Sequence, residues 1–360
     1  MHYVIVDFVV RKNSGGILSI LQDVNRYAEN HPEDSFTFIV GSEDVITKVS
    51  NINLILREDL QKNYFKRIFF DFFAGAKFIN SLNADVVISL QNTAILGLNT
   101  PEMLYVHQPL PFERNYKFSF FKASERKMAF YQHLVGSMIK LNLRKFNHGA
   151  ITVQTHWMKE ELNKYSQQQI FVTRPSISND EFKHKKIGQS GRDFFFPSTA
   201  MIYKNHKNLV EAYNGLPEEV KASHKLILTI TKEEYRTLYG NISDDSYIEF
   251  TGRIPRTEVI DILSHSFLVF PSKIETLGLP LIEAMMLQRQ IIASNISPVV
   301  EVTSEYDAVT YFNPDEVSSI RLALFKCLEM PPSKKKFEEK SQSDGWQEFF
   351  KNIGEIKDAK

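Results

Sequence analysis

The sequence predicts an α/β protein made of two Rossmann-like domains, on three observations. The chain has 360 residues, and one domain per about 150 residues gives two domains. Short apolar runs alternate with amphipathic stretches, which is typical of parallel sheets covered by helices on both faces. A polar stretch over 174–192, with Pro175, Gly188 and Gly191, interrupts this alternation. We therefore expect a first domain over 1–175, a linker over 176–192 and a second domain over 193–335.

The expected elements follow from these patterns. In the first domain, strands are expected at 3–10, 36–40, 54–56, 85–89, 103–106, 150–153 and 170–172, with helices such as 17–29 and 157–164 between them. In the second domain, strands are expected at 193–197, 225–231, 247–251, 267–270, 290–293 and 310–312, and helices at 206–214, 256–264, 280–287 and 317–329. A terminal segment over 336–360 ends in a helix whose apolar stripe includes Trp346 and Phe350.

The composition argues against several classes of protein. Acidic and basic residues balance at 43 each, so the overall charge predicts no nucleic-acid partner. The single cysteine, Cys327, lies on an expected helix face, which favours a packed thiol in a reducing compartment. The start of the chain shows no basic leader, and no stretch of about 18 uncharged apolar residues occurs. We therefore expect a cytoplasmic protein.

Ligands of open parallel sheets bind beyond the carboxyl ends of the strands. In the second domain, the strand FLVFPS runs into KIETLGLPLIEAMM. Pro280 suits the first turn of a helix, because its missing N–H has no partner there in any case. The free N–H groups at that helix start favour an anion, and Gly278 lets a phosphate approach the backbone closely.

Two glutamates flank this expected anion site. Glu283 falls within the first turn of the helix, where a carboxylate can accept hydrogen bonds from a vicinal diol such as ribose. Glu275 lies in the loop, on the sugar side of the phosphates. The alternative, which we weigh equally, is that Glu275 is an ordinary loop acid and Glu283 only interacts favourably with the helix dipole.

Three other strand ends carry candidate residues. Lys204 follows the strand at 193–197, where its ammonium can neutralise a diphosphate; a single lysine is more often solvated surface. Gly15-Gly16 precede the first helix and either admit a ligand or form only a turn. His107 follows the strand at 103–106 and either faces the crevice or is a structural histidine with satisfied hydrogen bonds.

Taken together, these motifs resemble the retaining GT-B glycosyltransferases of family 4, many of which build bacterial surface polysaccharides. The resemblance is carried by IETLGLPLIEAMM, YKNHKNLVEAY, Gly15-Gly16 and YVHQPLPF, and it extends to NPDE at 313–316 and the late Trp helix. It implies two Rossmann-like domains that face a central cleft, with the acceptor bound by the first and the nucleotide sugar by the second. It also implies that the terminal helix over 336–360 crosses back to the first domain.

The resemblance assigns roles to the candidates. Glu275 would contact the transferred sugar, Lys204 would stabilise the leaving diphosphate and His107 would lie near a sugar hydroxyl at the reaction centre. Glu283 would hold the donor ribose, and the N–H groups of 276–279 would cradle the phosphates. The expected donor-binding residues are Gly15, Gly16, Ser198, Lys204, Arg253, Ile254, Thr276, Leu277, Gly278, Leu279 and Glu283.

One position departs from the family. An arginine commonly stands six residues before the lysine, where this chain has Ser198. A second cation would then come from Lys207 or Arg253, or the diphosphate would rely more on the helix start. This departure puts the full phosphate clamp in doubt.

The resemblance implies a hexosyltransferase that moves a sugar from a UDP or GDP sugar to a hydroxyl of a glycan or lipid-linked glycan, without a cofactor. The chain contains no DxD sequence, the acidic pair with which metal-dependent transferases hold a divalent ion, so we expect metal independence. Two alternatives stay open: an epimerase of the same fold, and an inactive nucleotide-sugar-binding subunit, which Ser198 favours. A nicotinamide dehydrogenase is poorly supported, because the first strand lacks GxGxxG.

Two segments combine basic and aromatic residues, QKNYFKRIFFDFF at 61–73 and KFSFFKASERKMAFYQH at 117–133. Amphipathic helices of this composition can lie in a bilayer interface. The alternative is a stripe that faces the core, with a solvated opposite face, and both possibilities stay open. A lipid-linked acceptor would explain attachment to the inner face of the membrane.

Overall fold

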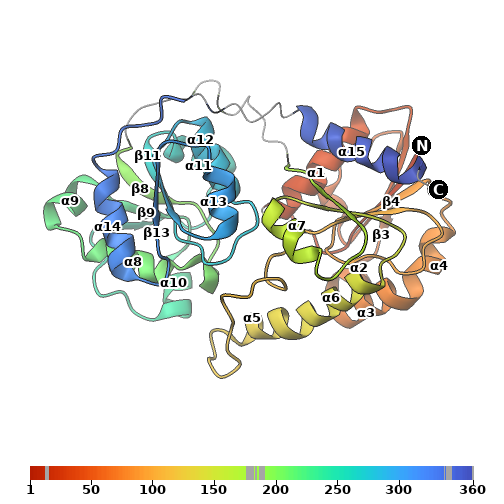
Figure 1. Cartoon of the computed structure of the whole chain (residues 1–360), viewed down its shortest axis with the longest axis horizontal. Helices are drawn as coiled ribbons and strands as arrows, with labels where there is room; N and C mark the ends of the chain where they lie inside the picture. The colour runs from red at the N-terminus through yellow and green to blue at the C-terminus, as the bar shows by residue number, and fades with distance from the viewer. Residues whose placement is uncertain are drawn as a thin grey trace. The chain divides into compact units, whose positions relative to one another are not determined.

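The computed structural model describes residues 1–12, 16–175, 182, 185, 191–335, 337 and 343–358. It divides into two compact units. Unit 1 comprises Met1–Phe112, Phe130–Ser176 and Ser341–Lys360, and unit 2 comprises Glu113–Ala129 and Ile177–Lys340. The linker expected over 176–192 lies mostly outside the described residues. Each unit contains a parallel sheet flanked by helices (Figure 1), which confirms the predicted fold class.

Within the described residues, unit 1 holds a seven-stranded sheet in the order β3-β2-β1-β4-β5-β6-β7, with every neighbouring pair parallel. Its strands are β1 (His2–Asp7), β2 (Ser35–Val40), β3 (Ile52–Leu56), β4 (Val86–Ser89), β5 (Glu102–Tyr105), β6 (Gly149–Val153) and β7 (Gln169–Val172). Tyr3 and Ile5 pack into one buried cluster, and Val4 and Val6 pack into another. Both faces of β1 are therefore covered, which explains the continuous apolar run in its sequence.

Helices cover both faces of this sheet. They are α1 (Gly16–Glu29), η1 (Glu43–Val45), α2 (Glu58–Lys62), α3 (Tyr64–Phe69), η2 (Phe70–Ala74), α4 (Gly75–Asn80), η3 (Tyr131–Val135), α6 (Gly136–Lys145), α7 (His156–Leu162) and α15 (Ser343–Asp358). The helix α5 (Arg126–Phe130) belongs to unit 2 except for its last residue, Phe130, which belongs to unit 1. The two segments η2 and η3 are π-helical, a conformation that is frequent at functional sites.

The terminal helix α15 packs on unit 1, beside α1 (Figure 1). The indole N–H of Trp346 donates to the carboxylate of Asp23 in α1, at 3.1 Å. The indole also stacks on the ring of Tyr105, with 6.2 Å between centroids, and Phe349 is fully buried in the same cluster. The apolar stripe seen in the sequence is thus the face of α15 that completes the core of unit 1.

Within the described residues, unit 2 holds a six-stranded sheet in the order β10-β9-β8-β11-β12-β13, again with parallel neighbours. Its strands are β8 (Asp193–Phe196), β9 (Leu226–Leu228), β10 (Ile248–Phe250), β11 (Ser266–Phe270), β12 (Ile291–Ser294) and β13 (Val309–Phe312). Its helices are η5 (Ile202–Lys204), α8 (His206–Asn214), α9 (Glu218–Ser223), α10 (Lys232–Tyr239), α11 (Arg256–Leu263), α12 (Leu279–Met286), α13 (Ser297–Thr303) and α14 (Val317–Cys327). The buried thiol of Cys327 packs in the core of this unit.

The structure adds the 3-10 helix η5 and three α-helices to the elements expected in the second domain. The helices α9, α10 and α13 were not expected, and each has at most eight residues. A second difference is that Glu113–Ala129, expected in the first domain, groups with unit 2. The ammonium of Lys273 lies 5.2 Å from the ring centroid of Tyr116 in that stretch. None of the helices formed by the described residues has the length and apolar character needed to cross a membrane.

Candidate functional site

The order of the strands reverses at one point in each sheet. In unit 2 the chain runs outward from β8 on one side and from β11 on the other, and in unit 1 the corresponding pair is β1 and β4. The crevice at the carboxyl ends of such a pair is the usual ligand site of an open α/β sheet. Ser198 and Lys204 follow β8, and Glu275 to Gly278 follow β11. The structure therefore brings these predicted residues of unit 2 together at its switch point.

A buried ion pair ties the two loops at the switch point of unit 2. The ammonium of Lys204 donates to Oε2 of Glu275 at 2.7 Å, and the two side chains are only 15% and 14% exposed. The same ammonium lies 5.6 Å from the ring centroid of Phe270, the last residue of β11. Attraction between a cation and the face of an aromatic ring adds to the ion pair. The sequence placed both residues at this sheet edge but gave no sign that they are paired.

Two opposing effects act on the pKa of Lys204. Burial lowers it, whereas the negative charge of Glu275 and the hydrogen bond to that carboxylate raise it, and the net shift is upward. Lys204 is therefore a cation at neutral pH. Its charge is partly balanced by Glu275, so a diphosphate would share this lysine with the carboxylate.

The start of α12 has the features of an anion site. Gly278 precedes the helix with φ 71°, in the left-handed region, and an added Cβ would lie 2.9 Å from Leu281 and 3.0 Å from Phe270. Glycine is therefore required there. The N–H of Thr276 donates to Oε1 of Glu275 at 3.1 Å. Over the described residues, the N–H groups at 277, 278 and 279 find no acceptor in the protein, so three of the four amides expected to cradle a phosphate are available to one.

Glu283 does not lie in the first turn of α12, which corrects the expectation from the sequence. The helix begins at Leu279, because Gly278 ends the loop in the left-handed conformation, and Glu283 is therefore its fifth residue. The side chain is 3% exposed, and its Oε1 accepts a hydrogen bond from Nη1 of Arg256 at 2.5 Å. Any diol bound by Glu283 would share the carboxylate with Arg256. Arg256 was not among the residues expected from the sequence, where its only signal is its position as the first residue of an expected helix.

Ser198 pairs with a buried histidine. Its hydroxyl lies 3.0 Å from Nε2 of His206, the first residue of α8, and its N–H donates to Oγ1 of Thr229 at 2.8 Å. Burial, and then the charge of Lys204, lower the pKa of His206 to about 3. The imidazole is therefore neutral, and its Nδ1 has no partner among the described residues. A neutral pair thus occupies the position at which the resemblance led us to expect an arginine.

The other cations considered for the diphosphate lie elsewhere. Lys207 forms an exposed ion pair with Glu211, at 3.8 Å. Arg253 is exposed and Ile254 half-buried in the loop after β10, where Gly252 has φ 66°. Since neighbouring strands are about 4.8 Å apart, this loop lies about 14 Å across the sheet from β11. The distance is compatible with a nucleoside that extends from a diphosphate at α12 to the loop after β10.

In unit 1, the predicted glycine pair is described only in part. Gly15 lies outside the described residues, and Gly16 is the first residue of α1. The preceding loop is shaped by Asp7, the last residue of β1, whose Oδ1 accepts hydrogen bonds from the N–H groups of Val9 and Val10 at 3.2 and 3.4 Å. Burial raises the pKa of Asp7 to about 7. Asp7 was not among the residues expected from the sequence.

His107 follows β5 and is held by Asn92, which lies in the loop after β4. Oδ1 of Asn92 accepts hydrogen bonds from the N–H groups of His107 and Gln108, at 2.8 and 2.9 Å. Nδ2 of Asn92 lies 3.3 Å from Nε2 of the imidazole. Burial lowers the pKa of His107 to about 4, so this histidine is neutral at physiological pH.

The loop that carries Asn92 is itself anchored by a buried aspartate. Asp71, in η2, accepts hydrogen bonds from Nε2 of Gln91 at 2.9 Å and from the hydroxyl of Thr93 at 2.8 Å. Burial raises the pKa of Asp71 to about 7, and it raises that of Glu102 well above its ordinary value. Ligands of open parallel sheets bind beyond the carboxyl ends of the strands, so the strand expected at 85–89 would have pointed to the loop that carries Asn92. The sequence contained no signal for Asp71, which belongs to an aromatic run.

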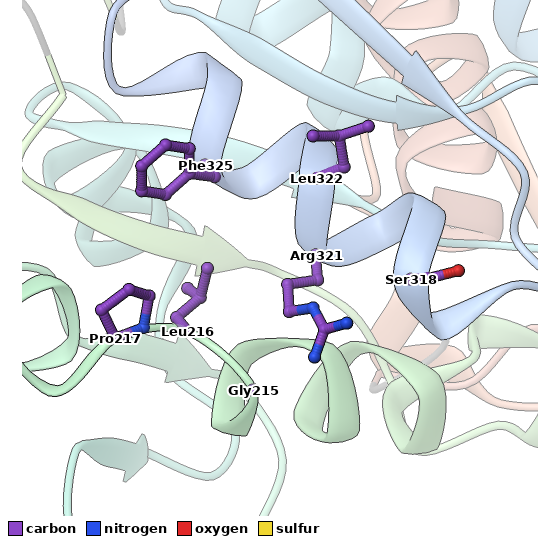
Figure 2. Close-up of a pocket in the computed structure, with 7 residues that line it drawn as sticks. All are labelled: Gly215, Leu216, Pro217, Ser318, Arg321, Leu322 and Phe325. Atoms are coloured by element: carbon purple, nitrogen blue, oxygen red, sulfur yellow. The ribbon is translucent and has the colours of Figure 1, made fainter.

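A pocket of about 350 Å³ lies in unit 2 beside the loop that follows α8 (Figure 2). Lys204 precedes α8 and is therefore at the opposite end of this helix. It is lined by Gly215, Leu216, Pro217, Ser318, Arg321, Leu322 and Phe325. These residues come from the loop after α8 and from α14, and none of them belongs to the candidate site. We assign the pocket no part in the chemistry.

The chain is similar to known glycosyltransferases. Residues 178–344 match the family model described as glycosyl transferases group 1. Over 147 residues, the chain is 34% identical to the serotype-specific mannosyltransferase WbdA of Escherichia coli, a match that covers 38% of this chain and 18% of WbdA. Over 156 residues, it is 26% identical to the O-antigen chain mannosyltransferase B of Escherichia coli, covering 41% of this chain and 36% of that protein. The matched regions thus span about a fifth and about a third of these relatives.

A solved structure shares the fold of most of the chain. The crystal structure of Anabaena Alr3699/HepE in complex with UDP and glucose superposes with a TM-score of 0.62, over 91% of this chain and 90% of that one, at 11% sequence identity. At this identity the likeness concerns the fold, which is that of GT-B glycosyltransferases.

The buried aspartate of η2 leads to a prediction about stability. Between its ordinary pKa of 3.8 and its folded pKa of about 7, Asp71 binds a proton only in the folded chain. The free energy of unfolding should therefore fall as the pH rises through this window. Asp71→Asn is neutral at every pH and can keep both hydrogen bonds. We expect it to raise the free energy of unfolding at pH 8 by on the order of 4 kcal/mol, and to flatten the slope below pH 7.

Urea unfolding of both proteins at pH 5 and pH 8 measures this effect. Asp59→Asn is the matched control, because Asp59 is 43% exposed and its pKa is lowered by the hydrogen bond from Arg57. A variant Asp71→Asn that is less stable than the wild type at pH 8 would contradict the assignment.

Proposed function

We propose that this chain is a retaining glycosyltransferase that moves a sugar from a nucleoside-diphosphate sugar to a hydroxyl of a glycan or lipid-linked glycan. The setting would be the synthesis of a bacterial surface polysaccharide such as O-antigen or capsule. One observation carries the proposal: the pair of Lys204 and Glu275 lies beside the unpaired amides of α12, at the switch point of a unit that matches the glycosyl transferases group 1. A cation, a carboxylate and a helix start together suit a pyrophosphate bonded to a sugar.

The chemistry of the donor follows from the same groups. The amides at 277–279 and the ammonium of Lys204 provide positive charge where negative charge grows on the departing diphosphate, which stabilises the transition state. Glu275, bound to Lys204, would contact the transferred sugar, and Glu283 would hold the ribose together with Arg256. The loop at 252–254 would receive the base. His107 and Gly16, from unit 1, would contact the sugar and the donor phosphate.

The relatives narrow the choice of donor to test first. Two of them are named as mannosyltransferases, and the solved neighbour holds UDP and glucose. A mannosyl donor is therefore the first candidate, with UDP and GDP as the nucleotides to compare. A thermal-shift panel of nucleotide sugars tests the proposal, since a ligand that binds only the folded protein raises its melting temperature. A panel in which no nucleotide sugar stabilises the protein would overturn it.

The ion pair gives a prediction about catalysis. Glu275→Gln keeps the shape of the side chain but removes the charge that faces Lys204. We expect transfer to fall by at least about 100-fold, with donor affinity largely unchanged, because the amides of α12 and Lys204 remain. Transfer is measured with radiolabelled donor, and affinity by calorimetry. The matched control is Glu211→Gln, which removes an exposed partner of Lys207 in the same unit. Unchanged turnover in Glu275→Gln would exclude this glutamate from the mechanism.

The proposed reaction does not depend on a divalent metal. The motivation is the lack of a DxD sequence together with the provision of positive charge by Lys204 and the helix start. We therefore expect the rate of transfer to be unchanged after treatment with EDTA. A loss of activity on chelation, restored by Mg²⁺ or Mn²⁺, would refute this part of the proposal.

Contact with an anionic membrane is proposed through one face of unit 1. Phe65, Phe69 and Phe73 recur every fourth residue along α3 and η2, and their side chains are 76%, 60% and 72% exposed. Phe70, on the opposite side, is buried against Phe8. One face of the segment 61–73 thus packs on the core, whereas the face that carries Phe65, Phe69 and Phe73 is exposed.

Basic residues accompany this aromatic face, since Lys62, Lys66 and Lys77 are all exposed on the same run of helices. Aromatic side chains flanked by lysines suit the interface of an anionic bilayer. The second segment, 117–133, is divided between the two units, with Ala129 in unit 2 and Phe130 in unit 1. We therefore base the proposed contact on the first segment alone.

Co-sedimentation with lipid vesicles tests this contact. We expect the protein to bind vesicles that contain phosphatidylglycerol at low salt, to release them at high salt, and to bind phosphatidylcholine vesicles weakly. Replacing Phe65, Phe69 and Phe73 by serine should abolish binding. The control replaces Leu322 and Phe325, which are exposed on α14 of unit 2. Binding that is absent in the wild type at low salt, or retained in the triple variant, would count against this face.

A further inference from the structure

The protonation state of His107 is fixed by its contacts with Asn92. The amide of Asn92 cannot be turned around, because its Oδ1 accepts two hydrogen bonds, from the N–H groups of His107 at 2.8 Å and Gln108 at 2.9 Å. Two backbone donors require an acceptor, so the other end of the amide, the Nδ2 group, must face the imidazole. It lies 3.3 Å from Nε2.

An amide nitrogen can only donate, and Nε2 of His107 must therefore accept. A neutral imidazole that accepts at one nitrogen carries its proton on the other. In His107 that other nitrogen is Nδ1, which is buried and has no hydrogen-bond partner in the described part of the chain. Buried polar groups are nearly always paired in folded proteins, so an N–H left free at the end of a strand marks a place for a ligand acceptor.

We infer that Asn92 holds His107 as a neutral imidazole with its proton on Nδ1, so that His107 donates an N–H to a sugar oxygen and does not act as a general base. The contact with sugar rests on the proposed function; the protonation state does not. Asn92 is a positioning residue in this scheme, and its own place is held by its neighbours, because Gln91 and Thr93 both donate to Asp71. The low pKa of His107, about 4 through burial, agrees with a neutral ring.

The backbone conformation of Asn92 permits a substitution that changes only the group facing the imidazole. Asn92 has φ 69°, in the left-handed region, which asparagine and aspartate tolerate better than other side chains do. Asn92→Asp therefore keeps the fold of the loop and both hydrogen bonds from the backbone. It changes only the group that faces Nε2, from a donor to an acceptor. The imidazole should respond by moving its proton to Nε2.

Nitrogen-15 spectra of histidine-labelled protein read this directly, with His107 assigned by its loss in His107→Gln. In the wild type at pH 7 we expect a protonated Nδ1 and an unprotonated Nε2. In Asn92→Asp we expect the reverse, with the pKa of His107 rising from about 4 toward the ordinary 6.5. The control Asn147→Asp, at an exposed position of unit 1, should leave the spectrum unchanged.

Three outcomes decide the inference. A wild-type imidazole that is protonated on Nε2, or on both nitrogens at pH 7, would overturn the inference. This measurement uses the wild-type protein and does not depend on whether a variant folds. The same proton position in wild type and Asn92→Asp would remove Asn92 from the scheme. On addition of the nucleotide sugar that stabilises the protein most in the thermal-shift panel, the Nδ1–H signal should move, whereas the free nucleoside diphosphate should leave it in place. A signal that the sugar does not move would overturn the contact with sugar, while a panel without binders would overturn the proposed function alone.

Discussion

The ion pair between Lys204 and Glu275 is the interaction on which the arrangement of the candidate site in unit 2 depends. It joins the loop after β8 to the loop after β11, the two strands at which the order of the sheet reverses. Since both side chains are largely buried, each charge offsets part of the other's cost of leaving water. The same carboxylate accepts the N–H of Thr276 and so orients the chain toward Gly278 and α12. One buried pair thus fixes a cation, an acid and a row of amides around one point.

The loops of both units are shaped by residues in the left-handed conformation that lie close to strand ends. In unit 2, Asn205 has φ 64° and Gly278 has φ 71°; in unit 1, Asn92 has φ 69°. Asn205 precedes α8, and its side chain donates to the carbonyl oxygen of Pro314 at 2.8 Å, whereas Gly278 precedes α12 and Asn92 lies in the loop after β4. In unit 2 the turn at Gly278 leaves the N–H groups of 277–279 without an acceptor, among the described residues, at the start of α12. In unit 1 the side-chain amide of Asn92 accepts hydrogen bonds from the N–H groups of His107 and Gln108 and so holds the loop after β5. The same fold therefore presents two kinds of surface to a ligand.

The strands were predictable because a parallel strand buried on both faces is a continuous apolar run, as in Phe194–Phe196 and Phe267–Phe270. The helices α9, α10 and α13 were missed because they are short, although α10 carried a readable signal: Thr231 and Glu234 form a capping box. The position of Glu283 was misjudged because the αL conformation of Gly278 moves the helix start by one residue. The grouping of Glu113–Ala129 with unit 2 depends on tertiary contacts, which no local pattern encodes.

The hydrogen-bond partners of the site residues could not be predicted either, because they too depend on tertiary contacts. Ser198 is an example. By the resemblance seen in the sequence, Ser198 suggested only a missing cation, whereas the structure pairs it with the neutral, buried imidazole of His206. The low pKa of that imidazole is caused by burial and by the charge of Lys204, so a second positive charge at this position is disfavoured by the first. The candidate site therefore concentrates its positive potential on Lys204 and the start of α12, and binding of a diphosphate would depend on the helix start more than on side-chain cations.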